Sequence, residues 1–144
     1  MSTQVLPSGI RIKHIGKFNM DDYEELLPQH DLGLALMDSP HPSLLPIEMA
    51  SAGLLVVTNT YGIKTAEYFR QISSNISAVP SDIESLAHAL LKQSAEAEHY
   101  EQRIAGSDVN WPHEWNEVLP DNELYKAIRE VEDSMQLAAA TAEE

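Results

Sequence analysis

The residues with the clearest chemical potential lie in and just after a short loop rich in proline and serine. The loop Asp38–Ser43 reads Asp-Ser-Pro-His-Pro-Ser, and the stretch after it predicts a helix over Leu44–Ala52. Ser43 is a residue type that commonly caps the N-terminus of a helix. The amides of Leu44 and Leu45 would then be free to point at a ligand. Free amides and the helix dipole together favour an anion, such as a diphosphate.

Two side chains could share that site. Glu48 lies about one turn into the predicted helix. Helical side chains tilt toward the N-terminus, so its carboxylate could reach the pocket and accept hydrogen bonds from ribose hydroxyls. His41 lies in the loop and could donate to a phosphate or a sugar hydroxyl. A plainer interpretation stays open, in which Ser43 only caps the helix and both side chains only face solvent.

The elements that must position this loop alternate between strands and helices. Continuous apolar stretches predict buried strands at Leu32–Met37 and Leu54–Thr58. Further strands are predicted at Ile10–Ile15, from its alternation, and at Asn75–Val79. Helical segments separate the strands, which indicates parallel βαβ units. We therefore expect an α/β fold with a parallel sheet of about four strands, flanked by helices.

Capping residues and periodic apolar positions predict the helices. Asn19 caps a short helix, and either Ser81 or Asp82 caps a longer one. A final helix is expected over Asp121–Met135. The apolar face of the longer helix is expected to hold Ile83, Leu86, Ala87, Leu90 and Leu91, and that of the final helix Leu124, Ile128, Val131 and Met135.

A second loop is expected beside the first. In an open α/β sheet, ligands bind at the carboxyl ends of the strands. The loop Asn59–Ile63 follows the strand after the one that leads into Asp38–Ser43, so the two loops are expected to be neighbours. Asn59 is a candidate ligand contact. Lys64 could offset phosphate charge, or it is an ordinary solvated lysine of a helix.

Composition excludes several classes of function. The chain has 144 residues, enough for one domain with one core, and no cysteine, which excludes disulfides and thiol catalysis. The formal net charge of −14 disfavours nucleic acid as a partner. No stretch approaches the roughly 18 apolar residues that a membrane span needs. The six histidines show no metal-binding spacing, so no metal is expected, and a cytoplasmic location is the default.

The stretch Ser39–Gly53 together with Val56–Asn59 resembles a known family. It reads Ser-Pro-His-Pro-Ser-Leu-Leu-Pro-Ile-Glu-Met-Ala-Ser-Ala-Gly, then Val-Val-Thr-Asn. This pattern looks like the C-terminal, donor-binding domain of GT-B glycosyltransferases. The likeness is greatest to the rhamnosyltransferase-like branch of bacterial polysaccharide and S-layer glycan synthesis. It extends from about Ile12 to Trp115.

The resemblance implies a role for particular residues. It places Glu48 on the ribose of a nucleotide-diphosphate sugar, the donor substrate, with Ser43 and Leu44 at the diphosphate. It implies no cofactor and assigns no catalytic residue. The first glutamate of the family motif falls at Pro40, so that contact with the donor sugar is absent here.

The resemblance also implies a truncated Rossmann-like domain over residues 1–120, followed by an amphipathic helix and mobile tail over 121–144. The family's acceptor-binding N-terminal domain has no counterpart in this sequence. We therefore expect the isolated chain to be inactive, with such a domain on another chain as a candidate partner. A second copy could cover the apolar face of the final helix, which suggests a homodimer. The alternative is a non-enzymatic α/β binding or protein-interaction module.

Overall fold

The computed structural model describes residues 2–39, 41, 43–112 and 114–141. It divides into two compact units, Met1–Val109 and Asn110–Glu144. The second unit contains the helices α6 (Trp115–Val118) and α7 (Asp121–Thr141). None of the described helices combines the length and apolarity that crossing a membrane would require.

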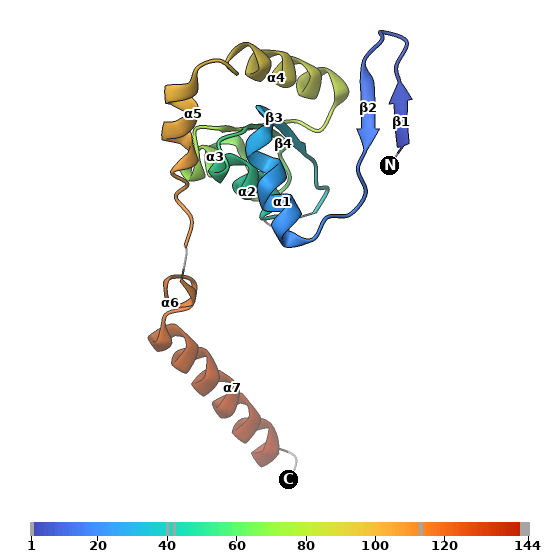
Figure 1. The fold of residues 1–144 in the computed structure, drawn as a ribbon. Coiled ribbons are helices and arrows are strands. Elements are labelled where there is room, and N and C mark those ends of the chain that lie inside the picture. Colours follow the sequence, from blue (N-terminus) through green and yellow to red (C-terminus); the bar gives the residue numbers. More distant parts are fainter. Residues whose placement is uncertain (1, 40, 42, 113, 142–144) are drawn as a thin grey trace. The chain divides into compact units, whose positions relative to one another are not determined.

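A three-stranded parallel sheet forms the centre of the first unit (Figure 1). Its order is β3 (Leu32–Ala35), β4 (Leu55–Asn59) and β5 (Ile76–Val79). Every residue of the central strand β4 is buried, as expected for a strand that is covered on both faces. Because all three strands run in one direction, their carboxyl ends lie at one edge of the sheet.

Helices flank this sheet and close its core. The core contains apolar side chains of α2 and α3 together with those of β4. The predicted α/β class, with a parallel sheet, flanking helices and a helical C-terminus, is confirmed and is consistent with a truncated Rossmann-like domain. The helices of this unit are α1 (Met20–Leu26), the 3₁₀ turn η1 (Leu27–Gln29), α2 (Leu45–Ser51), α3 (Ala66–Ile72), α4 (Ile83–Ala95) and α5 (Tyr100–Ser107).

The strand expected at Ile10–Ile15 exists but does not join the parallel sheet. As β2 (Arg11–His14) it pairs in an antiparallel hairpin with β1 (Ser2–Val5), so the parallel sheet has three strands instead of about four. The turn is closed by a hydrogen bond between the Leu6 N–H and the Ile10 carbonyl. All four residues of β2 are exposed. Their alternating polar pattern lacks the continuous apolar surface that a strand covered on both faces requires.

The cap of α4 is confirmed, whereas its predicted apolar face is partly wrong. Of the two candidate caps, Asp82 accepts a hydrogen bond from the Ser85 N–H at 2.8 Å. Ile83 and Leu91 lie on the solvent side, with 86% and 71% exposed, while Ala89 is buried. The sheet therefore covers a narrower stripe of the helix than the apolar pattern predicts.

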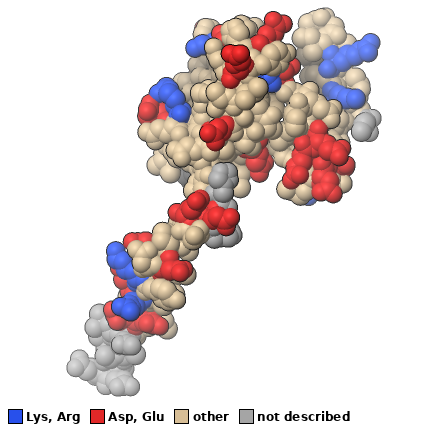
Figure 2. Space-filling model, turned by 60° about the vertical axis from the view of Figure 1, so that its left-hand side comes forward, with Lys and Arg blue, Asp and Glu red and all other residues tan. Residues whose placement is uncertain are grey.

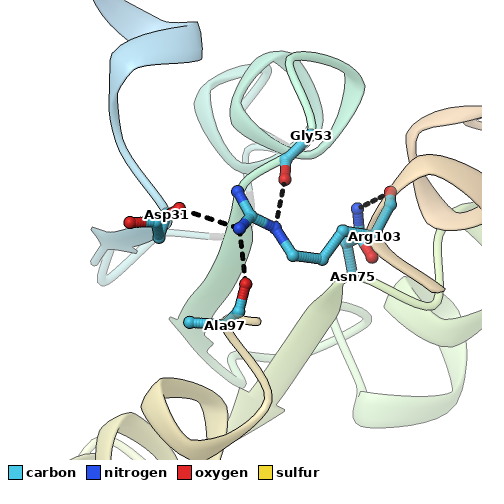
Figure 3. Close-up of polar contacts among 5 residues, drawn as sticks. All are labelled: Asp31, Gly53, Asn75, Ala97 and Arg103. Atoms are coloured by element: carbon cyan, nitrogen blue, oxygen red, sulfur yellow. Dashed lines mark hydrogen bonds and ion pairs between the residues drawn. The ribbon is translucent and has the colours of Figure 1, made fainter. Parts of the chain in front are cut away.

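Hydrogen bonds of Arg103 connect α5 with the amino-terminal edge of the sheet (Figure 3). Its Nε donates to the Gly53 carbonyl at 3.0 Å, and its Nη1 donates to Asp31 Oδ1 at 2.8 Å and to the Ala97 carbonyl at 2.6 Å. The Asn75 side chain donates to the Arg103 carbonyl at 2.8 Å. Asp31, Gly53 and Asn75 lie just before β3, β4 and β5. Since ligands bind at the opposite edge of such sheets, this cluster stabilises the fold.

Candidate functional site

The two predicted loops meet at the carboxyl edge of the sheet. The Asn59 side chain, at the end of β4, accepts from the Met37 N–H at 2.8 Å and donates to the Met37 carbonyl at 3.1 Å. The Lys64 ammonium donates to the same carbonyl at 3.2 Å. The expectation that these loops are neighbours is thus confirmed. Two of the predicted site residues converge on the backbone that leads out of β3.

Lys64 is not an ordinary solvated lysine of a helix. It precedes α3, whose N-cap is Thr65, and only 3% of Lys64 is exposed. Its ammonium lies 5.9 Å from the centroid of the Tyr61 ring. Within the described part of the chain, no carboxylate forms an ion pair with it. A buried cation with neutral partners is poorly compensated, which favours an anion in its neighbourhood.

His41 folds back on its own loop. Its Nδ1 accepts a hydrogen bond from the Ser43 N–H at 3.1 Å, and its own N–H donates to Ser39 Oγ at 3.2 Å. Because Nδ1 is an acceptor, the neutral ring carries its proton on Nε2, which can donate to a ligand. Pro40, where the first glutamate of the family motif falls, lies outside the described residues, as does Pro42.

The predicted N-cap of α2 is wrong. Leu44 is the N-cap, and its side chain makes no capping bond. Ser43 has a φ of 45°, in the left-handed region, whereas a capping serine needs an extended backbone to bring its hydroxyl over the first turn. The helix therefore begins at Leu45, whose N–H has no partner within the helix. Leu44 and Leu45 are both exposed.

Glu48 lies in a cavity between α1 and α2. Its Oε2 accepts a hydrogen bond from the Tyr23 hydroxyl at 3.4 Å. Burial, together with the charge and the hydrogen bond of Glu48, raises the pKa of the Tyr23 phenol, so Tyr23 remains a donor. The cavity has a volume of about 290 Å³. It is lined by Met20, Tyr23, Glu24, Leu27, Glu48, Ser51 and Ala52.

The sequence did not predict that Tyr23 lines this cavity. In the structure Tyr23 is half-buried. Tyr23 and Glu48 are 25 residues apart, and no local pattern joins them. Only the packing of α1 beside α2 brings the phenol to the carboxylate. Arg103 was missed for the same reason, since its partners come from four different segments.

Two further histidines make contacts within their own part of the chain. His30 Nδ1 lies 2.9 Å from the Leu26 carbonyl, and His99 pairs with Glu96 on the preceding turn. Across the described ranges, no three His, Asp or Glu side chains come together in the way that metal ligands do.

Comparison with known families assigns the chain to one of them. Residues 1–91 match the family described as WsaF, C-terminal domain. This segment comprises 91 of the 144 residues and contains every candidate site residue. The chain belongs to the WsaF C-terminal domain family. WsaF is a glycosyltransferase-related protein, so the chain carries a glycosyltransferase-associated domain.

The match to the WsaF C-terminal domain covers only part of the chain. It ends within α4, so α5 with Arg103 and the whole second unit lie beyond it. No curated protein matches the chain.

Proposed function

We propose that this WsaF C-terminal domain binds the nucleotide-diphosphate-sugar donor of a glycosyltransferase. The finer assignment is to the GT-B, rhamnosyltransferase-like branch and to polysaccharide or glycan synthesis. The family match and the sequence resemblance support it. The single observation that carries it is the buried ammonium of Lys64 at the carboxyl edge of the sheet.

Local donors must hold the diphosphate, because the charge of the whole chain opposes an anion. The formal net charge is −14, and Figure 2 shows acidic side chains over both units. Lys64 supplies a cation that forms no ion pair with the described carboxylates, and the loop after β3 supplies the first amides of α2 and the Nε2 proton of His41. Asn59 uses both ends of its amide on Met37. Its proposed role is therefore to hold the loop in place beside Lys64.

Glu48 takes the ribose in this proposal. A carboxylate would repel a phosphate, but it accepts hydrogen bonds from hydroxyl groups. Its position in a cavity of about 290 Å³, on the same short helix that the loop leads into, suits the nucleoside part of the donor.

Thermal unfolding in the presence of nucleotides tests the proposal. We expect one of dTDP, UDP or GDP, alone or as its sugar conjugate, to raise the melting temperature, because a ligand that binds only the folded state stabilises it. Glu48→Ala should abolish the shift. Glu25→Ala is the matched control, because Glu25 is an exposed glutamate of α1 that does not line the cavity.

Two outcomes would contradict the proposal. An unchanged melting temperature with every nucleotide would favour the alternative of a non-enzymatic binding module. An equal loss of the shift in Glu48→Ala and Glu25→Ala would show that no specific carboxylate is involved.

A further inference from the structure

The cavity between α1 and α2 has a chemical character of its own. Two carboxylates line it, from Glu24 and Glu48, together with the phenol of Tyr23. Two negative charges disfavour a phosphate there. The same groups suit a neutral ligand part that is rich in hydroxyl donors. Its volume of about 290 Å³ is at the lower end of small-molecule sites, which start near about 300 Å³, so it suits a part of a nucleotide.

We propose that Tyr23 is a positioning residue that orients the Glu48 carboxylate toward the ribose hydroxyls of a nucleotide. This inference rests on the proposed function. It adds a residue from α1 to a site that the sequence places on α2, on the loop before it and on the segment between β4 and α3. The observation behind it is the hydrogen bond of 3.4 Å between the Tyr23 hydroxyl and Glu48 Oε2, across two helices.

The arrangement leaves the carboxylate ready for a ligand. A carboxylate has about four acceptor positions, and Tyr23 occupies one of them, so most remain free for hydroxyl donors. Glu48 is otherwise exposed, and a free glutamate side chain samples many rotamers. Holding it before the ligand arrives lowers the entropy lost on binding.

Tyr23 is suited to this part because it can only donate to Glu48. A tyrosine phenol carries its proton at neutral pH, and burial together with Glu48 raises the pKa of Tyr23 further. Its ring is half-buried, so the hydroxyl has a defined direction. Substitution by phenylalanine would remove the hydrogen bond and retain the ring.

Calorimetric titration of the full chain tests this role with the nucleoside diphosphate that stabilises the wild type and with its 2′,3′-dideoxy analogue. We expect Tyr23→Phe to weaken binding of the hydroxyl-bearing nucleotide about 3- to 10-fold, the effect of one lost hydrogen bond. Binding of the dideoxy analogue should be nearly unchanged. Tyr125→Phe, at an exposed tyrosine of α7, is the matched control.

A double-mutant cycle separates positioning from simple packing. In a Glu48→Ala background, Tyr23→Phe should have no further effect on the weak affinity that remains at high nucleotide concentration, because the carboxylate that it orients is gone. Equal affinity of wild type and Tyr23→Phe would overturn the inference, and so would an equal loss for both ligands. Absence of binding to the wild type would instead overturn the proposed function, so the two failures are distinguishable.

Discussion

At the scale of single residues, one backbone position organises the carboxyl edge of the sheet. Met37 has its N–H and its carbonyl bound by the Asn59 amide, and the same carbonyl receives the Lys64 ammonium. The amide of Asn59 thus replaces the backbone partner that a neighbouring strand would supply. The start of the loop is held in place, while the charge of Lys64 stays without a carboxylate in the described part of the chain.

Lys64→Met should therefore separate stability from binding. The variant keeps an unbranched side chain that is one atom shorter and removes a poorly compensated buried charge, so we expect the free energy of unfolding to be unchanged or to rise by up to about 1 kcal/mol. Nucleotide affinity should fall at least about 10-fold, since an ion-paired hydrogen bond is worth roughly 1.5–3 kcal/mol. Urea unfolding and calorimetric titration measure the two quantities.

Lys92→Met is the control for that variant, because Lys92 is an exposed lysine in the last turn of α4. A strongly destabilised Lys64→Met protein that still bound nucleotide with full affinity would show that Lys64 is only structural.

At the scale of elements, α5 shows how a short helix is held by contacts outside itself. Eight residues are too few for a stable isolated helix. Besides Arg103, the Ser73 hydroxyl donates to the Gly106 carbonyl at 2.6 Å, and Asn75 packs against the same glycine. A Cβ at Gly106 would lie 2.1 Å from Asn75 Oδ1, so only glycine allows this approach.

Gly106→Ala should destabilise the domain by about 1–3 kcal/mol, the usual cost of overpacking, as measured by urea unfolding. Combined with Asn75→Ala, it should cost less than the sum of the two single changes, because the two nearest clashing atoms, Oδ1 and Cγ of Asn75, are gone. The nucleotide-induced shift should persist in folded Gly106→Ala, since α5 is fastened at the amino-terminal edge of the sheet. A fully additive double variant would argue against the clash.

At the scale of the whole chain, the apolar face of α7 favours self-association, whereas the net charge opposes it. Leu124, Ile128, Val131 and Met135 recur at helical spacing on α7, and all four are exposed. Such a face is a candidate contact surface. A net charge of −14 on each copy opposes self-association, more strongly at low salt. The homodimer stays a prediction.

Light scattering at high protein concentration tests the homodimer. If a second copy covers the apolar face of α7, the dimer fraction should rise with salt, because ions screen the repulsion between the copies. Ile128→Lys should then yield a monomer, whereas Lys126→Ala, on the same helix but off the apolar face, should not. A wild-type monomer at high concentration and high salt would contradict the prediction.

Features that depend on neighbours along the chain could be predicted. The apolar stretches that became β3 and β4, the Asn19 and Asp82 caps, and the adjacency of the loops after two consecutive parallel strands follow from periodicity, local hydrogen bonds and βαβ geometry. The same local evidence located the loop and helix that carry most candidate site residues. It failed at Ser43, because a single φ value decides whether a serine can cap.

Other features depend on which distant segments pack together. The burial of Lys64, the Tyr23–Glu48 contact and the four-way bonding of Arg103 join residues that are far apart in sequence. Whether β2 pairs with β1 or joins the parallel sheet likewise depends on segments other than β2 itself. Spacing along a chain specifies the faces of helices and strands. What each face meets, and therefore the charge and solvent access of a side chain, is set only when the elements assemble.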